Sequence, residues 1–207
     1  MSNSHRIEAW GFSGGIWLLW RNNVCVEIKL QHFQFLHFSL RVDFGEMEFT
    51  GVYGSPQLAM HCYLWENLCQ LASYVQSPWY VAGDFNAILS ADEIRGSTTS
   101  LRRCCRRFQN CMDTCSLEDL GYQGPQFTWH RGLVWERLDR ALANQSWLQT
   151  FPSAQVFHLP TLCSDHCPLL IDLGVPQQPV PLQGLPFRFQ IGMPQCLVVL
   201  FAENGSS

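Results

Sequence analysis

The sequence predicts an α/β fold. Short runs rich in β-branched and aromatic residues alternate along the chain with segments whose apolar residues recur at helical spacing. Of the 207 residues, 47% are hydrophobic, which is enough for a buried core. At roughly 150 residues per domain this length allows one domain with a remainder, and no apolar run approaches the roughly 18 residues needed to cross a bilayer.

The first part of the chain is predicted to consist mainly of strands. Four runs are rich in β-forming residues and separated by turn-like breaks, and the last ends at the turn sequence GSP. These runs are residues 14–20, 24–30, 33–42 and 46–53. Apolar residues then recur at helical spacing from Leu58 to Val75, Pro78 ends that helix, and residues 79–82 form a short buried strand.

Residues 100–115 predict an amphipathic helix. One stripe carries apolar residues and cysteines, whereas the opposite side carries Arg102, Arg103, Arg106 and Arg107. A solvated helix face is favoured over a DNA-binding face for these arginines. Further along, strands are predicted at 126–130, 154–159 and 168–173, with a helix near 140–150.

The charge of the chain argues against a charge-driven nucleic-acid binder. The net charge is -4, only 14% of residues are charged, and Lys29 is the single lysine. The first residues lack the pattern of a signal peptide, so we expect an intracellular protein, nuclear or cytoplasmic, that is not secreted.

The ten cysteines include no CxxC pair and are interpreted as reduced, mostly buried thiols. A zinc site formed by Cys163, Asp165, His166 and Cys167 is the alternative, although structural zinc sites prefer paired CxxC or HxxxH spacing.

Polar and acidic residues follow several predicted strands. The sequence GDFN places Asp84 and Asn86 at the end of a buried strand, SDH supplies Asp165 and His166, and Asp139 and Tyr53 lie at similar positions. Metal-assisted phosphodiester hydrolysis requires three kinds of group: carboxylates that hold Mg²⁺, a group that takes a proton from water, and neutral hydrogen-bond donors to the phosphate. Turns also prefer these residues, so each motif alone is weak.

Two acidic sites have plainer alternatives. Asp139 could form a surface ion pair with Arg137 or Arg140. Asp92 and Glu93 are interpreted as a pair of loop carboxylates.

In combination these segments resemble a known family. The blocks SGGIWLLW, GVYGSP, WYVAGDFNAIL, DEIRGS, FTW, ERLDRALAN and SDHCPLLI follow one another as in the endonuclease domain of plant LINE-type (non-LTR) retrotransposons. That domain is similar to DNase I and belongs to the endonuclease/exonuclease/phosphatase superfamily. The resemblance covers residues 10–173, which makes residues 1–9 a leader outside the family and residues 174–207 a Pro/Gln-rich linker with a short tail.

The resemblance implies a four-layer α/β sandwich, in which two mixed β-sheets pack face to face with helices outside. The family domain normally begins with a strand that carries a catalytic Asn, followed by a segment that ends in a metal-ligating Glu. This chain enters the pattern at about Trp10, after both motifs, so we expect a truncated domain without its first strands. Glu8 has no matching motif around it and is not assigned the ligand role.

The resemblance also implies roles for the catalytic residues. Asp84 would activate or orient the attacking water, Asn86 would hold that water and the scissile phosphate, and Tyr53 would contact the phosphate. Asp139 would orient His166, which would stabilise the charge on the phosphate oxygens.

The remaining site residues concern the metal and the DNA. Asp165 would lie beside the Mg²⁺ (or Mn²⁺) that Asp84 helps to hold. Thr128 and Trp129, in the FTW block, would be structural or would contact the edge of the DNA.

Three functions stay open. The first is a Mg²⁺-dependent endonuclease-like domain that nicks DNA, and the second is a catalytically inactive relic of the same fold, favoured by the missing Asn and Glu. A phosphatase of the same superfamily is the third. The resemblance implies that the parent element also encodes a reverse transcriptase domain, and this sequence does not contain that domain. We expect the protein to be a monomer that does not bind membranes. We expect its DNA binding to be weak and sensitive to salt.

Overall fold

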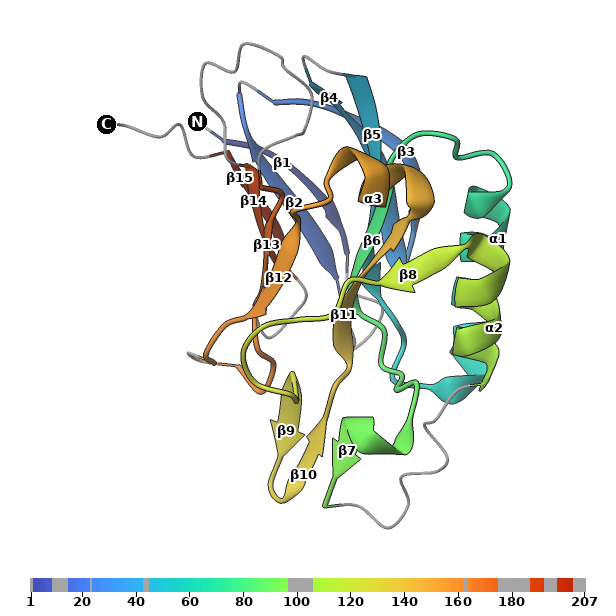
Figure 1. Ribbon diagram of the computed structural model, residues 1–207, viewed down its shortest axis with the longest axis vertical. Coiled ribbons are helices and arrows are strands. Elements are labelled where there is room, and N and C mark those ends of the chain that lie inside the picture. Colours follow the sequence, from blue (N-terminus) through green and yellow to red (C-terminus); the bar gives the residue numbers. More distant parts are fainter. Residues whose placement is uncertain are drawn as a thin grey trace.

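Two six-stranded β-sheets face each other, and a small three-stranded sheet lies at one end of the molecule (Figure 1). The computed structural model describes residues 2–8, 15–22, 24–42, 45–96, 106–161, 164–174, 187–191 and 197–202. The α/β class and the face-to-face arrangement of the sheets agree with the prediction. None of the helices in these ranges is long and apolar enough to span a membrane.

The first large sheet has the order β3-β4-β5-β6-β11-β8. Its neighbours pair antiparallel except β5 and β6, which are parallel and are connected through a helix, α1 (His61–Ala72). A short 3-10 turn, η1 (Leu58–Met60), precedes α1. The strands are β3 (Cys25–His32), β4 (Phe35–Val42), β5 (Gly45–Tyr53), β6 (Trp79–Asp84), β8 (Leu117–Asp119) and β11 (Asp139–Asn144).

The second large sheet has the order β1-β2-β15-β14-β13-β12. Its strands are β1 (Ser2–Ile7), β2 (Ile16–Arg21), β12 (Gln155–His158), β13 (Leu169–Asp172), β14 (Phe187–Ile191) and β15 (Leu197–Ala202). The small sheet consists of β7 (Ile94–Arg95), β9 (Trp129–Arg131) and β10 (Val134–Glu136). The remaining helices are the 3-10 turn η2 (Ala91–Glu93), α2 (Arg106–Cys115) and α3 (Gln145–Thr150).

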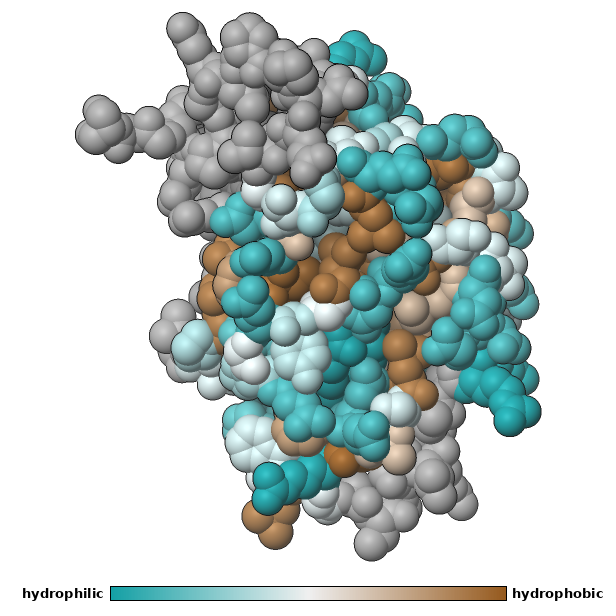
Figure 2. Space-filling view, viewed as in Figure 1, coloured by the Kyte–Doolittle hydropathy of each residue, from teal (hydrophilic) through white to brown (hydrophobic). Residues whose placement is uncertain are grey.

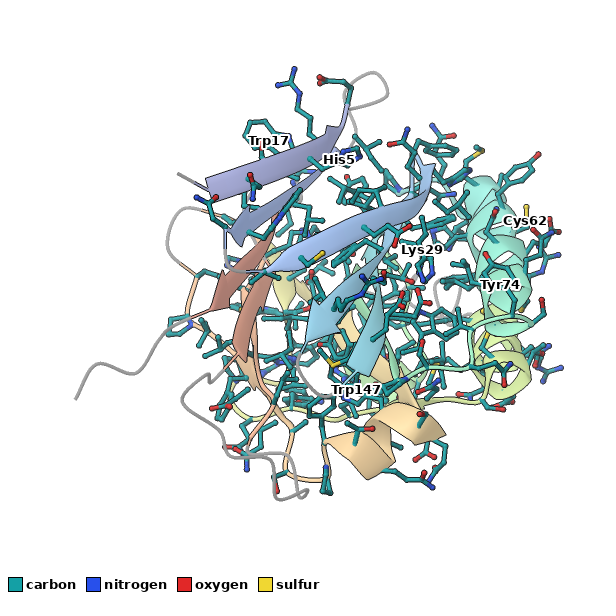
Figure 3. All side chains as sticks on the ribbon, turned by 90° about the horizontal axis from the view of Figure 1, so that it is seen from above. His5, Trp17, Lys29, Cys62, Tyr74 and Trp147 are labelled. Atoms are coloured by element: carbon teal, nitrogen blue, oxygen red, sulfur yellow. The ribbon has the colours of Figure 1, made fainter. Side chains whose placement is uncertain are left out.

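Strand alternation divides the core into two layers. Side chains such as Phe49, Tyr80 and Ala141 point between the two sheets, whereas Val81 and Leu142 point outward beneath the helices. The apolar stripe of α1 and the stripe of α2 pack on that outer face. Trp147 of α3 joins the inner layer, as Figure 3 shows.

The predicted helix near 140–150 is wrong over its first half. Residues of the sequence DRALAN form the strand β11, because they pair with β6 on one side and β8 on the other. Only α3 is helical, and the Asn144 side chain caps it by accepting a hydrogen bond from the Trp147 backbone N–H (2.9 Å). Tertiary pairing thus overrides the helix propensity of alanine and leucine.

Most other predicted strands are close to the observed ones, but of the strand predicted at 126–130 only the end lies in a strand, β9 (Trp129–Arg131). The strands predicted at 24–30, 33–42, 46–53, 79–82, 154–159 and 168–173 correspond to β3, β4, β5, β6, β12 and β13. Strand β1 and the strands β14 and β15 were not predicted, and all three extend the second sheet by backbone pairing. The domain division at residues 10 and 173 stays a prediction.

The arginine-bearing helix is described from Arg106 onward, so Arg102 and Arg103 lie outside the described residues. Arg106 and Arg107 are exposed, whereas Phe108, Cys111 and Met112 are buried against α1. Polar side chains cover this flank of the molecule in Figure 2. These contacts agree with a solvated helix face beside a core face.

Candidate active site

Three neighbouring strands bring Tyr53, Asp84 and Asp139 to the same level of the first sheet. Tyr53 ends β5, Asp84 ends β6 and Asp139 begins β11, and Asp84 is the register partner of both of the others. Because side chains alternate along a strand, all three lie on the face that is turned toward the second sheet. Both carboxylate residues are 5% exposed, whereas Tyr53 is half-buried.

The fourth member of this site comes from the segment that leads into the other sheet. His166 lies in the segment before β13, and its Nδ1 is 2.8 Å from Oδ2 of Asp139. Its Nε2 is 4.0 Å from Oδ2 of Asp84. The structure therefore brings Asp84, Asp139 and His166 together between the two sheets, at the end of the inter-sheet core.

The electrostatics of His166 follow from these two carboxylates. Burial by itself lowers the pKa of the imidazole, but the hydrogen bond and charge of Asp139, with smaller contributions from Asp84 and Asp165, outweigh it and raise the pKa to about 9. His166 is therefore an imidazolium at neutral pH in the absence of a bound cation, and it can donate a hydrogen bond to an anionic oxygen.

The GDFN sequence forms a tight turn that holds the Asp84 carboxylate. Asn86 has a φ of 48°, a left-handed conformation that asparagine tolerates. Its backbone N–H donates to Oδ1 of Asp84 (2.8 Å), and its side-chain amide donates to Oδ2 of Asp84 and to the Gly54 carbonyl (2.8 Å each). The role expected for Asn86, holding the attacking water and the scissile phosphate, stays a prediction. In the structure its N–H groups bind the Asp84 carboxylate.

Glycine is required on both sides of this turn. Gly83 has a φ of 143°, and a Cβ there would overlap the Val52 carbonyl group of β5. A Cβ at Gly54 would overlap the Phe85 backbone. The two glycines of GVYGSP and GDFN thus let β5 and β6 approach closely beside Asp84.

Thr128 supports Asp139 from behind. Its hydroxyl oxygen accepts hydrogen bonds from the backbone N–H groups of Leu138 (3.0 Å) and Asp139 (2.9 Å). The residue is fully buried, with 0% exposure. Of the two roles predicted for Thr128, its contacts therefore support the structural one over DNA contact.

Trp129 and Asp165 are joined to each other beside the site. The indole N–H of Trp129 donates to Oδ2 of Asp165 (2.9 Å), and the Trp129 ring lies 6.4 Å from the His166 ring. Trp129 also forms an isolated β-bridge with His166. The carboxylate of Asp165 is thus held by the indole, and it lies outside the group of ligand atoms formed by Asp84, Asp139 and His166.

The interpretation of Asp139 as the partner of Arg137 or Arg140 is wrong. Both arginines instead bind Glu93 and Asp119 at 2.7–2.9 Å. Arg140 follows Asp139 on β11 and therefore points to the opposite face of the sheet, beneath the helices, where its guanidinium lies over the Phe108 ring. Glu93, interpreted from the sequence as a loop carboxylate, is a partly buried ion-pair partner of two buried arginines.

The donor atoms suit a cation held largely by oxygen. The ligand atoms of Asp84, Asp139 and His166 lie within 4.8 Å of one another. Mg²⁺ prefers oxygen ligands and is commonly held by one or two carboxylates together with substrate phosphates. The two carboxylates fit that pattern, whereas the imidazolium of His166 fits an anionic oxygen.

The alternative zinc site is not assembled in the described part of the chain. Cys163 lies outside the described residues, the Cys167 thiol donates to the Phe127 carbonyl (3.7 Å), and Asp165 is bound to Trp129.

Comparisons with known proteins agree with this architecture. The endonuclease domain of TRAS1, a telomere-specific non-LTR retrotransposon, is similar in fold, with a TM-score of 0.60 and 15% identity over 80% of this chain and 75% of that one. An endonuclease/exonuclease/phosphatase family protein from Leptotrichia buccalis gives a TM-score of 0.47 with 14% identity, covering 76% of this chain and 62% of its own. Truncated Caenorhabditis elegans TDP2 gives 0.46 with 11% identity, covering 72% and 66%.

No curated protein matches the chain by sequence. The sequence model of the endonuclease/exonuclease/phosphatase family, however, matches residues 10–166, which contain every residue of the site. The chain therefore belongs to the endonuclease/exonuclease/phosphatase family.

Proposed function

We propose that this protein is a divalent-metal-dependent phosphodiester hydrolase of the endonuclease type that acts on DNA. The observation that carries the proposal is the partly buried contact of His166 with two carboxylates, 2.8 Å from Asp139 and 4.0 Å from Asp84, at the junction of the two sheets. A protonated imidazole held between carboxylates suits the recognition of a phosphate oxygen beside a cation.

Each residue then has a defined task. Asp84 would orient or deprotonate the attacking water, and Asn86 would hold the Asp84 carboxylate in place through its two N–H contacts. Asp139 would fix the imidazole of His166, which would donate from Nε2 to a phosphate oxygen, while Tyr53 would contact the phosphate from β5. Mg²⁺, when bound by the Asp84 and Asp139 carboxylates, would supply charge neutralisation at the phosphate.

DNA as the substrate rests on similarity and chemistry together. The TRAS1 domain, which shares the fold, is an endonuclease domain. The net charge of -4 makes tight binding through the phosphate backbone unfavourable. We therefore expect weak, salt-sensitive DNA binding that depends on the local shape of the duplex.

Nicking of supercoiled plasmid tests the proposal, because one cut per molecule changes the plasmid form. Wild-type protein with Mg²⁺ should convert supercoiled to open-circular DNA, and EDTA or Asp84→Ala should abolish conversion. Circular dichroism and gel filtration must show that both proteins are folded and monodisperse. If folded wild type cuts no faster than Asp84→Ala, the protein is a catalytically inactive member of the family.

A further inference from the structure

Three cysteine thiols meet between α1 and α2, on the side of the first sheet away from the active site. The Sγ atoms are 3.9 Å apart for Cys69 and Cys111, 3.8 Å for Cys111 and Cys115, and 3.8 Å for Cys115 and Cys69. Cys111 and Cys115 are four residues apart and so share one face of α2, opposite Cys69 of α1. The three sulfur atoms form a nearly equilateral triangle.

The triangle is partly enclosed by apolar side chains. Cys111 and Cys115 are 4% and 6% exposed, and Cys69 is half-buried at the edge of the same cluster. The thiols bind mainly one another, with one further contact from Cys111 to the Trp65 carbonyl (3.6 Å). Thiols are weak hydrogen-bond donors and acceptors, so these contacts alone contribute little to packing the two helices.

The sulfur spacing matches a metal–thiolate site. With a metal–sulfur bond of about 2.3 Å, two sulfur ligands lie about 3.8 Å apart in a tetrahedral site and about 4.0 Å apart in a trigonal planar one. The observed separations of 3.8–3.9 Å fall in that interval. A disulfide would require two sulfurs to approach to about 2.05 Å and would leave the third thiol without a role.

We propose that Cys69, Cys111 and Cys115 form a three-sulfur binding site for a thiophilic d¹⁰ cation, Zn²⁺ or Cu⁺. Soft thiolate ligands select these ions, and binding releases the thiol protons. No further His, Cys, Asp or Glu joins this group among the residues that the structure describes. A three-coordinate Cu⁺ needs no fourth ligand, whereas Zn²⁺ would take water at the half-exposed Cys69 edge. By joining α1 to α2, the ion would stabilise the helical layer.

Metal titration of the reduced full chain under anaerobic conditions tests the proposal. Zn²⁺ and Cu⁺ are each titrated in competition with a chromophoric chelator, and X-ray absorption spectroscopy counts the sulfur ligands. We expect one high-affinity equivalent with three sulfurs at about 2.3 Å. Cys69→Ser should lower the metal affinity by about 100-fold, because substituting even a residue that only supports a metal ligand typically lowers the affinity by about 10- to 100-fold.

Cys62→Ser is the matched control. Cys62 lies on the same helix, α1, but its side chain points away from the sheets (Figure 3) and its thiol contacts the Ala59 carbonyl. This variant should bind like wild type, and the metal should raise the melting temperature of both but not of Cys69→Ser. The proposal is overturned if wild type binds neither ion, if Cys69→Ser binds as tightly as Cys62→Ser, or if the spectra show fewer than three sulfurs. The last criterion uses wild type alone, so it holds even if a variant fails to fold.

Discussion

At the residue scale, Asp84 and Asp165 differ in what holds their carboxylates. Asp84 is held by the Asn86 backbone and side chain and lies with Asp139 and His166 in one group of ligand atoms. Asp165 is held by the Trp129 indole, outside that group. This difference favours Asp84 over Asp165 as the carboxylate on which a bound cation depends.

Paired asparagine substitutions check this assignment. Asp84→Asn keeps the shape of the side chain but removes its charge, so we expect Mg²⁺-dependent nicking to fall by at least about 100-fold. Asp165→Asn should retain nicking within about tenfold, with an unchanged Mg²⁺ requirement. The dependence of the nicking rate on Mg²⁺ concentration is the measurement. Equal loss in the two variants, both folded, would show that Mg²⁺-dependent nicking depends on Asp165 as much as on Asp84.

The buried hydroxyl of Thr128 stabilises the start of β11 through two hydrogen bonds. Thr128→Val conserves volume but removes the acceptor for the Leu138 and Asp139 N–H groups, which then stay buried without that partner. We expect the free energy of unfolding to fall by about 1–3 kcal/mol. Thr128→Ser keeps the hydroxyl and is the control. Urea denaturation of both variants measures the difference, and equal stability of the two would show that the hydroxyl contributes nothing.

At the scale of elements, β11 connects the site to the helical layer. Asp139 projects from one face toward His166, and the next residue, Arg140, projects from the other face to Glu93 and Asp119. Arg140 is 0% exposed, so its charge depends on these two carboxylates. The strand that begins at Asp139 of the candidate site is thus anchored by a buried ion-pair network on its opposite side.

Glu93→Gln tests this network. The substitution leaves the buried Arg140 with one anionic partner, so we expect a loss of about 3 kcal/mol in the free energy of unfolding at neutral pH. Glu66→Gln, on the exposed side of α1, should change stability by less than about 0.5 kcal/mol. Denaturant unfolding measures both, and a Glu93→Gln variant as stable as Glu66→Gln would contradict the assignment.

The same network predicts the response to acid. Burial tends to raise the pKa of Glu93 and Asp119, but hydrogen bonds from Arg140 and Arg137 outweigh it and hold both pKa values below their usual range. A carboxyl with a lowered pKa in the folded state contributes stability above its unfolded pKa of about 4 and loses it as the pH falls through the folded value. The gap in stability between wild type and Glu93→Gln should therefore narrow below about pH 4.

At the scale of the whole molecule, the two sides of the first sheet have different environments. The inner side ends in the acidic candidate site, and the outer side is covered by α1 and α2 with the exposed Arg106 and Arg107. Among the described helices none covers the second sheet in the same way. DNA bound at the candidate site would therefore lie near the ends of β5 and β6 and the start of β11, away from the solvated face of α2.

This placement predicts that the arginines of α2 matter little for DNA. Arg106→Gln combined with Arg107→Gln should change the affinity for a short duplex by less than about twofold, measured by fluorescence anisotropy at low salt. Raising the salt concentration should weaken binding equally in wild type and variant. A drop of more than about tenfold, with a smaller salt dependence, would instead make the α2 face part of the DNA interface.

How much of this protein could be predicted depended on the range of the interactions. The GDFN turn is local, since Asp84 and Asn86 are two residues apart and bind each other, so residue types alone indicated the site. The register of β5, β6 and β11 is not local, but an ordered series of motifs in a known family indicated that Tyr53, Asp84, Asp139 and His166 converge. The partners of Arg140 were missed because Glu93 and Asp119 lie 47 and 21 residues away in sequence.

The amino-acid sequence by itself thus determined the α/β class and most strands of the first sheet, and it predicted the residues of the candidate site. These depend on alternation of apolar residues, turn chemistry and motif order, all of which are written along the chain. The tertiary structure decided that residues 139–144 form a strand, that Glu93 and Asp119 pair with the buried arginines, and that three cysteines from two helices meet. Each of these depends on which faces pack together, and the packing of distant segments is set by the fold as a whole.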